Sequence, residues 1–278
     1  MSNHSKTARL IDDAYFTPVE SAKFCQSFLY VHDWVGYDKV VLEPCAGDGV
    51  LTDGLPGEIY LQDINALRSD VVEQDYLTAP VRPVDLVFTN PPFGTMCNLA
   101  VPFFNKACKD SDRVAFIIPA TFRKVSVTDK LDLNFWNIVD EDLPDLNFRL
   151  PDGSTKWVKC IFQMWERRTK PRKKIKDQVK IKDYFTRLKA PEPGCYAFRT
   201  QGASAGRVLD GLDHSPASTA FLIGSKDRVL AHDWTNLAKN TAGIPAIGLL
   251  DVAWYLHLED QGIDINPLLT NGKNHLCY

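Results

Sequence analysis

Several features that mark common functional classes are missing from this sequence of 278 residues. No apolar run approaches the ~18 residues of a membrane-spanning helix, and the polar start, Met1 to Arg9, has no signal-peptide core. The seven cysteines form no CxxC pair and no Cys/His ligand spacing, and none of the six histidines lies in a ligand pattern. We therefore expect no membrane span, no metal site, no disulfide framework and a reducing, cytoplasmic location.

Two nucleotide-binding signatures are also absent. The chain has neither a GxGxxG dinucleotide motif nor the Gly-Lys-Ser/Thr of a phosphate loop. Instead, residues 43–49 read Glu-Pro-Cys-Ala-Gly-Asp-Gly, directly after an apolar strand expected over 39–44. The glycines let the backbone approach a ligand, and the acidic flanks favour the cationic end of an amino acid over a phosphate.

Two later carboxylates extend this candidate ligand site. Asp63 follows a second strand, predicted over 58–62, about where α/β nucleotide sites hold ribose hydroxyls. Asp75 lies in a short third segment, 71–76, and could accept a hydrogen bond from an adenine amine. An amino acid, a ribose and an adenine together describe S-adenosylmethionine. The other interpretation is an ordinary glycine turn with surface aspartates.

A strand expected over 84–89 leads into Asn90-Pro91-Pro92-Phe93, a motif suited to holding a planar, amine-bearing group. Asn90 offers a side-chain carbonyl and Pro91 a backbone carbonyl, so two acceptors can meet one NH2. Neither proline donates an N–H, which keeps the loop stiff, and Phe93 can stack on a flat ring. The motif predicts modification of an exocyclic or amide nitrogen.

The succession of elements predicts a mostly parallel α/β sheet. A helix is expected from Pro18 to near Gly36 with Thr17 as its cap, and further helices over 98–109 and 122–133. Continuous apolar strands are expected at 113–119 and 138–143, and a longer alternating strand at 157–165 near the sheet edge. We predict domains over 1–168 and 195–278, joined by a basic linker over 169–194, with a small α+β region at the C-terminus.

Charge is distributed unevenly along a chain of ordinary composition, 45% hydrophobic and 24% charged. Residues 1–166 hold 15 Lys+Arg against 24 Asp+Glu, whereas residues 167–278 hold 17 against 11. A polyanion would prefer the second half, although a solvated basic linker explains the run at 167–176 equally well. Phe148-Arg149 pairs an aromatic ring with a cation, but a core ring beside a solvated cation is the simpler interpretation. The candidate nucleic-acid-binding residues are Arg123, Lys124, Arg172, Lys173, Lys174, Arg199 and Arg207.

The order of these motifs resembles that of class I S-adenosylmethionine-dependent amino-methyltransferases over about residues 14–166. It is most similar to the N6-adenine DNA methyltransferases of the gamma arrangement, in which the cofactor motif precedes the catalytic motif. The resemblance implies a Rossmann-like, mostly parallel sheet of about seven strands. It assigns catalysis to Asn90, Pro91, Pro92 and Phe93. It assigns cofactor binding to Thr17, Pro18, Glu43, Ala46, Gly47, Asp48, Asp63, Asp75 and Asn90.

We therefore predict an S-adenosylmethionine-dependent methyltransferase that acts on the exocyclic N6 amine of adenine in nucleic acid, with DNA preferred. Hydrogen bonds to Asn90 and Pro91 would expose the lone pair of the amine, and Phe93 would stack on a base that has left any duplex. Three alternatives stay open. They are an RNA N6-adenine methyltransferase, a protein glutamine N-methyltransferase, which uses the same tetrapeptide with tyrosine usually last, and a catalytically inactive nucleic-acid-binding relative.

Overall fold

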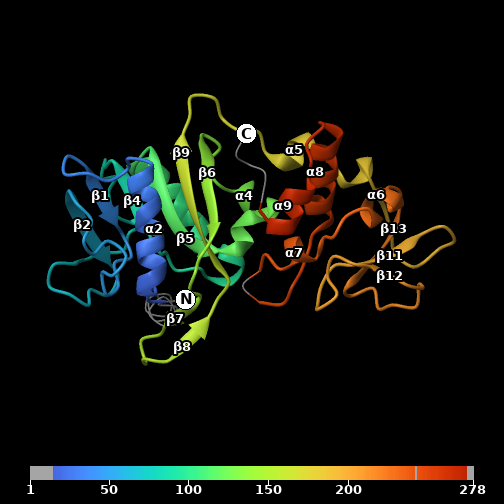
Figure 1. Ribbon diagram of the computed structural model, residues 1–278, viewed down its shortest axis with the longest axis horizontal. Helices are drawn as coiled ribbons and strands as arrows, with labels where there is room; N and C mark the ends of the chain where they lie inside the picture. The colour runs from blue at the N-terminus through green and yellow to red at the C-terminus, as the bar shows by residue number, and fades with distance from the viewer. Residues whose placement is uncertain (1–14, 242, 274–278) are drawn as a thin grey trace. The chain divides into compact units, whose positions relative to one another are not determined.

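The computed structural model of the chain describes residues 15–241 and 243–273, and they form two compact units (Figure 1). Unit 1 comprises residues 15–119 and 130–172, and unit 2 comprises 120–129 and the described residues from 173 onward. This division differs from the predicted domains, because residues 120–129 join unit 2 and residues 173–194 are folded into it. The expectations for Met1 to Arg9 and for Cys277 lie outside the described residues.

Unit 1 is built on a seven-stranded sheet with the order β3-β2-β1-β4-β5-β9-β6. Strands β3, β2, β1, β4 and β5 run parallel, while β9 lies antiparallel between β5 and β6. The first five positions follow the doubly wound Rossmann order. The predicted Rossmann-like, mostly parallel sheet is therefore confirmed. The strands are β1 (Val40–Glu43), β2 (Glu58–Asp63), β3 (Val72–Glu73), β4 (Leu86–Thr89), β5 (Arg113–Pro119), β6 (Phe135–Asp142) and β9 (Cys160–Arg167).

The strand predicted at 157–165 was expected near the edge of the sheet, and that position is wrong. Strand β9 pairs with β5 on one side and β6 on the other, so it lies inside the sheet and not at its edge. Its buried apolar residues, including Phe162 and Trp165, fit that interior position. The alternation seen in the sequence came from Gln163, which is also buried and accepts a hydrogen bond from Nε1 of Trp165 (3.2 Å).

Two α-helices belong to the described part of unit 1, α2 (Val19–Val31) and α3 (Ala100–Asp110). Pro18 precedes α2 with an extended backbone, and Thr17 makes no cap hydrogen bond to the helix. The hydroxyl of Thr17 instead accepts a hydrogen bond from Asn90. The predicted capping role of Thr17 is therefore wrong, since its side chain turns toward the end of β4.

A β-hairpin that the sequence pattern did not reveal joins β7 (Asn147–Arg149) to β8 (Thr155–Trp157). Its turn is closed by a hydrogen bond from the Leu150 N–H to the Ser154 carbonyl (2.8 Å). On the other edge of β7, Phe16 N donates to Arg149 O (2.9 Å) and Arg149 N donates to Phe16 O (3.2 Å). We call residues Tyr15, Phe16 and Thr17 the strap. The strap therefore runs extended beside the hairpin, at the lower edge of unit 1 in Figure 1.

Unit 2 is an α+β structure, which confirms the predicted C-terminal fold class. Its antiparallel sheet has the order β10-β13-β11-β12, formed by β10 (Thr186–Leu188), β11 (Tyr196–Arg199), β12 (Val208–Leu209) and β13 (Thr219–Ile223). The helices are α4 (Val125–Thr128), α5 (Ile175–Gln178), α6 (Lys226–Leu230), α7 (Thr235–Ala238), α8 (Leu249–Asp260) and α9 (Asn266–Asn271).

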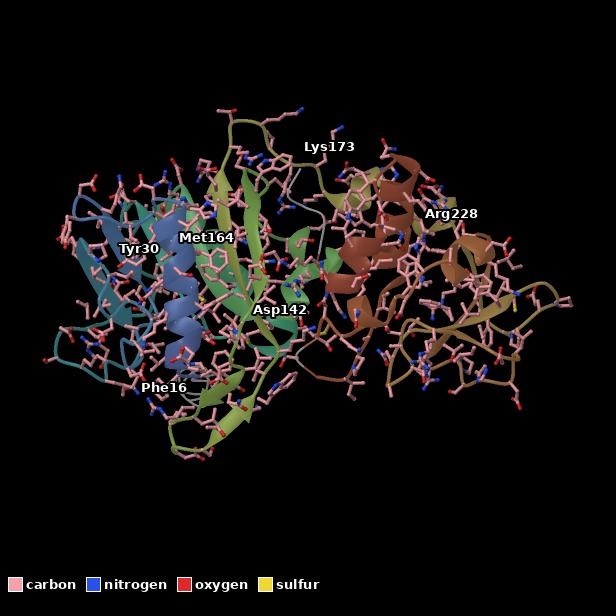
Figure 2. All side chains as sticks on the ribbon, viewed as in Figure 1. Phe16, Tyr30, Asp142, Met164, Lys173 and Arg228 are labelled. Atoms are coloured by element: carbon pink, nitrogen blue, oxygen red, sulfur yellow. The ribbon has the colours of Figure 1, made fainter. Side chains whose placement is uncertain are left out.

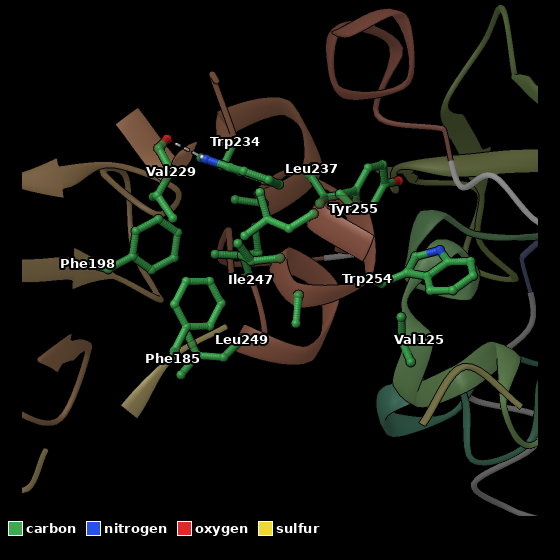
Figure 3. Packing of buried hydrophobic residues seen from close by; sticks show 14 of the residues in the cluster. Val125, Phe185, Phe198, Val229, Trp234, Leu237, Ile247, Leu249, Trp254 and Tyr255 are labelled. Carbon is green, nitrogen blue, oxygen red and sulfur yellow. Dashed lines mark hydrogen bonds between the residues drawn. The ribbon is translucent and has the colours of Figure 1, made fainter. Parts of the chain in front are cut away.

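One hydrophobic cluster holds the elements of unit 2 together (Figure 3). Within it Trp234 packs against Tyr255, with ring centroids 6.3 Å apart, and the indole N–H of Trp234 donates to the carbonyl of Val229 (2.9 Å). Val125 of α4 belongs to the same cluster. Ile175 and Phe185 also belong to it, so the stretch predicted as a linker contributes core residues.

Candidate active site

The turn after β1 is held in shape by the carboxylate that follows β2. Gly47 adopts φ +52°, in the left-handed region, and its N–H donates to Oδ2 of Asp63 (2.9 Å). Oδ1 of Asp63 accepts the N–H of Asn65 (2.9 Å). A carboxylate offers about four acceptor positions, so Asp63 keeps free acceptor capacity while its orientation is fixed.

Glu43, at the end of β1, places a buried carboxyl group beneath this turn. It is 1% exposed and accepts a short hydrogen bond from the hydroxyl of Thr52. Burial raises the pKa of the Glu43 carboxyl well above its usual range, and the nearby carboxylates of Asp48 and Asp63 add to the effect. A cation bound beside Glu43 would lower this pKa again. The turn therefore suits a positively charged guest.

The strap covers the turn from above. A Cβ added at Gly47 would lie 3.2 Å from the ring of Phe16, so the absence of a side chain at Gly47 lets that ring sit directly on the turn. Arg149 packs on the same ring: its guanidinium is 4.5 Å from the Phe16 ring centroid, and its Nη2 is 2.6 Å from a carboxylate oxygen of Asp48. Figure 2 shows Phe16 beside the hairpin. The pocket between the turn and the strap holds about 20 Å³, room for one water.

Six of the predicted cofactor residues line this pocket together, and the strap completes it. The lining residues are Tyr15, Phe16, Thr17, Glu43, Cys45, Ala46, Gly47, Asp48, Val50, Leu51 and Asn90. Pro18, Asp63 and Asp75 are not among them. Asp75 is exposed and its Oδ1 accepts the N–H of Leu77 (3.0 Å). The cofactor roles of all nine residues, inside and outside the lining, stay predictions.

Asn90 is fixed at the end of β4 by its amide nitrogen. Nδ2 donates to the carbonyl of Tyr15 (2.8 Å) and to the hydroxyl of Thr17 (3.0 Å). Both of its N–H groups are thereby used, and the amide orientation is set by two acceptors. Oδ1 is left buried with no hydrogen-bond partner. Since buried acceptors are rarely left unpaired, Oδ1 of Asn90 is positioned to receive a donor from a ligand.

Phe93 lies under the ring of Tyr15. The two rings stack with centroids 5.6 Å apart and planes 16° from parallel, and Phe93 is 6% exposed. The edge of Phe148 packs against Tyr15 from the hairpin. The loop Pro91-Pro92 brings Phe93 back toward α3, whose first amides lie within 3.4 Å of the Phe93 carbonyl. Asn90 and Phe93 thus both contact the strap, Asn90 through hydrogen bonds to Tyr15 and Thr17 and Phe93 through the ring of Tyr15.

Two of the predicted nucleic-acid contacts are buried. Arg123 is 1% exposed and Arg172 is 5% exposed. Arg172 donates from Nε to the carbonyl of Phe135 (3.1 Å) and from Nη2 to that of Leu131 (3.0 Å). Its guanidinium therefore ties the chain that follows β9 to Leu131 and to the start of β6, and is not available to a phosphate. The prediction for these two arginines is wrong for this physical reason.

The other candidates lie in unit 2 and differ in exposure. Lys173 and Arg207 are exposed, while Lys124, Lys174 and Arg199 are partly buried. Nζ of Lys124 donates to the carbonyl of Ala246 (2.9 Å), and Nε of Arg199 donates to that of Gln201 (2.9 Å). Lys173 and Arg207 are thus the best placed of the five to meet a polyanion.

Neither a metal centre nor a membrane span is found where the structure describes the chain. No group of three or more His, Cys, Asp or Glu residues within 15–241 and 243–273 could hold a metal ion. Over the same residues, no helix is long and apolar enough to cross a bilayer.

No protein-family model matches this sequence, and no curated protein matches it. Solved structures do resemble it in fold. A protein of Pyrococcus horikoshii described as a "putative RNA methyltransferase" has 20% identity and a TM-score of 0.46, over 59% of this chain and 98% of that one.

Two further structures of similar fold differ more in length. A "putative class I S-adenosylmethionine-dependent methyltransferase" of Listeria monocytogenes has 19% identity and a TM-score of 0.39, over 57% of this chain and 63% of that one. The M protein of the Type I restriction enzyme EcoKI has 15% identity and a TM-score of 0.43, over 57% of this chain and 45% of that one. These likenesses concern the fold alone. We infer function from the site itself.

Three residues of the site escaped the sequence interpretation, namely Tyr15, Phe16 and Lys156. Phe16 was visible beside Thr17, but only the β-bridge to Arg149 places its ring on Gly47. Lys156 comes from the unpredicted hairpin, and its Nζ lies 2.8 Å from the Tyr15 hydroxyl. The sequence pattern pointed to this hairpin only through the pair Phe148-Arg149, an aromatic ring beside a cation, and both residues lie in β7. Phe148 is a core ring, as the simpler interpretation held.

Proposed function

We propose that this protein is an S-adenosylmethionine-dependent methyltransferase that acts on the N6 amine of adenine in nucleic acid, with DNA preferred over RNA. One observation carries the proposal. Oδ1 of Asn90 is a buried acceptor without a partner, held at the end of a parallel strand by an amide whose two N–H groups are already used. Such an acceptor suits an NH2 group. The Asn90 amide cannot flip to present Nδ2 instead of Oδ1, because it would lose its hydrogen bonds to Tyr15 and Thr17.

The residues of the turn fit the proposed cofactor. S-adenosylmethionine carries positive charge at its sulfonium and its amino group, and the turn offers the buried Glu43 with Asp48 and Asp63. Gly47 provides the bare backbone that a close ligand needs. When bound, the cofactor would supply an electrophilic methyl group. Thr17 and Pro18 would close over its methionine end, and Asp63 and Asp75 would hold ribose and adenine.

The chain's own residues then align the nucleophile. Asn90 accepts one N–H of the target amine, and the carbonyl of Pro91 accepts the second. These two bonds draw the nitrogen toward a tetrahedral shape and free its lone pair from the ring. Phe93 stacks on the base. Alignment and preorganised dipoles supply the rate enhancement, and no strong base is needed because the amine becomes acidic only after methylation.

Exposed cations support nucleic acid as the substrate class. The second part of the chain carries a surplus of positive charge, and Lys173 and Arg207 are exposed there. A phosphate backbone is the polyanion that such residues bind. Protein glutamine would offer a similar amide to Asn90 but would leave this surplus unexplained.

The test is transfer of labelled methyl from S-adenosylmethionine to three acceptors in parallel: unmethylated DNA, total RNA and cell protein. Digestion to nucleosides and mass spectrometry identify the product. The full chain is compared with Asn90→Ala and with the matched variant Asn271→Ala, an exposed residue at the end of α9 that lies outside the pocket lining. We expect N6-methyladenine from the wild type and Asn271→Ala, and about 10²–10³-fold less from Asn90→Ala.

Label in RNA adenine alone would move the substrate from DNA to RNA and keep the chemistry. Label in protein alone would overturn the nucleic-acid assignment. Cofactor binding without transfer to any of the three acceptors would favour the catalytically inactive relative.

A further inference from the structure

Tyr15 occupies the place that a target base would need. Its ring stacks on Phe93 nearly in parallel, and only 6% of Phe93 is exposed. A flat ring that stacks on Phe93 must therefore displace Tyr15. A base between the two rings needs outer rings about 7 Å apart, two contacts of about 3.5 Å, which is more than the 5.6 Å centroid separation. The present contact is too close to admit one.

Lys156 holds Tyr15 in this position. Its Nζ donates to the phenol oxygen (2.8 Å) and lies 5.3 Å from the centroid of the ring. Lys156 is an exposed residue of β8, opposite Phe148 in the hairpin register. Because Phe148 and Lys156 are paired across the hairpin, they point to the same face, and both contact Tyr15.

The contacts of Tyr15 match the two parts of a nucleotide. Phe93 receives a flat ring, and Lys156 receives an oxygen. A base and its phosphate offer the same pair of groups, but the phosphate oxygen carries charge and forms the stronger bond to an ammonium. A nucleotide can therefore replace Tyr15 at both contacts.

We propose that Tyr15 and Lys156 bind the target nucleotide. Tyr15 leaves Phe93 as the base enters and closes on the outer face of that base, while Lys156 exchanges the phenol for a phosphate oxygen of the same strand. The inference rests on the proposed function, since it assigns the target subsite of the same enzyme. It adds two residues that contact the substrate outside the Asn-Pro-Pro-Phe motif.

The experiment measures kcat and KM for the nucleic acid that the wild type labels, at several salt concentrations. The variants are Lys156→Gln, Tyr15→Leu and Tyr15→Phe, with Lys109→Gln as the control. Lys109 is an equally exposed lysine in the last turn of α3. Melting temperature and the affinity for S-adenosylhomocysteine are recorded for each variant, because a purely structural role would lower both.

For Lys156→Gln we expect a raised KM, a kcat within twofold of wild type, and a salt slope reduced by about 0.7–0.9, the value for one phosphate contact. For Tyr15→Leu we expect kcat/KM to fall about 5- to 150-fold, the range for one lost base–aromatic stack. Tyr15→Phe keeps the stack and loses only the bond to Lys156, so its kcat/KM should equal or exceed that of wild type.

Two results would overturn the inference. One is a Tyr15→Leu variant with wild-type kcat/KM, and the other is a Lys156→Gln salt slope equal to that of Lys109→Gln. Wild-type protein that labels no nucleic acid would overturn the proposed function as well. Failure of the variants alone, with adenine still methylated, would overturn only the roles of Tyr15 and Lys156.

Discussion

Replacing Asn90 tests the acceptor on which the proposed chemistry depends. Asn90→Ala removes the buried Oδ1 together with both anchoring hydrogen bonds, to Tyr15 and Thr17. Loss of one preorganised polar group at a reacting centre typically lowers kcat by about 10²–10³. The variant keeps Glu43, Asp48 and Asp63, so the affinity for S-adenosylhomocysteine should stay within a few-fold.

Thr17 allows the anchor to be separated from the acceptor. Thr17→Val keeps the shape of the side chain but removes the oxygen that accepts from Nδ2 of Asn90 (3.0 Å). One neutral hydrogen bond contributes about 1 kcal/mol, so kcat of Thr17→Val should fall about fivefold. Thr17→Ser keeps the hydroxyl and should keep the wild-type kcat. In the Asn90→Ala background the same change should have no further effect, because the bond is already gone.

The assay is the initial rate of methyl transfer at saturating cofactor, with S-adenosylhomocysteine affinity measured by calorimetry. Wild-type kcat in Asn90→Ala would refute the reasoning outright. A Thr17→Val loss that persists undiminished in the Asn90→Ala background would show that Thr17 acts through another partner. Melting temperatures of all variants separate these outcomes from unfolding.

Three other changes probe the turn and the charged surface. Gly54→Ala, at φ +77° with open space around it, carries backbone strain of about 1–2 kcal/mol. Gly47→Ala carries similar strain and adds a tight contact, because its Cβ would lie 3.2 Å from the Phe16 ring. Calorimetry should therefore give Gly47→Ala the lower melting temperature and the weaker cofactor affinity, and equal values for the two variants would contradict the contact. Burial raises the pKa of Glu43, and a bound cation would lower it again, so binding of the cationic ligand should release a proton. The affinity should therefore increase as the pH rises toward the pKa of Glu43 in the ligand-free protein. Calorimetric titrations in two buffers of different ionisation enthalpy measure this proton release, and proton uptake on binding would contradict the reasoning. Lys173→Gln combined with Lys174→Gln should reduce the slope of log affinity against log salt concentration for nucleic-acid binding by up to about 1.8. An unchanged slope would mean that the two lysines do not contact phosphates.

The residues of the site could be predicted because polar groups follow successive parallel strands. Glu43, Asp63 and Asn90 each stand at or directly after a strand, and the carboxyl ends of parallel strands meet at one edge. The structure accordingly brings Glu43 and Asn90 into one pocket. What the pattern could not show is the outcome of packing from distant segments, such as the placement of Phe16 on Gly47 by a bridge to Arg149.

The basic stretch shows why charge alone misled. Arg172 stands in a run of cations, yet its guanidinium is buried against the carbonyls of Leu131 and Phe135, more than 35 residues earlier. Within the predicted linker, Ile175 and Val179 are four residues apart, the spacing of one helical face, and both are buried. That apolar pair was the available sign that residues 173–194 belong to a folded unit.

The strap couples the two halves of the proposed site. Tyr15 stacks on Phe93, Phe16 packs on Gly47, and the hydroxyl of Thr17 accepts a hydrogen bond from Asn90. Three consecutive residues thus contact the proposed base platform, the proposed cofactor turn and the proposed catalytic amide. A backbone shift that lifts Phe16 from the turn would also move Tyr15, so we expect entry of the cofactor to disturb the cover on Phe93. Linkage then requires equal effects in both directions. S-adenosylhomocysteine should raise the affinity for substrate nucleic acid by the same factor as the nucleic acid raises that for S-adenosylhomocysteine. Independent affinities, each measured with and without the other ligand, would mean that the strap moves as separate residues.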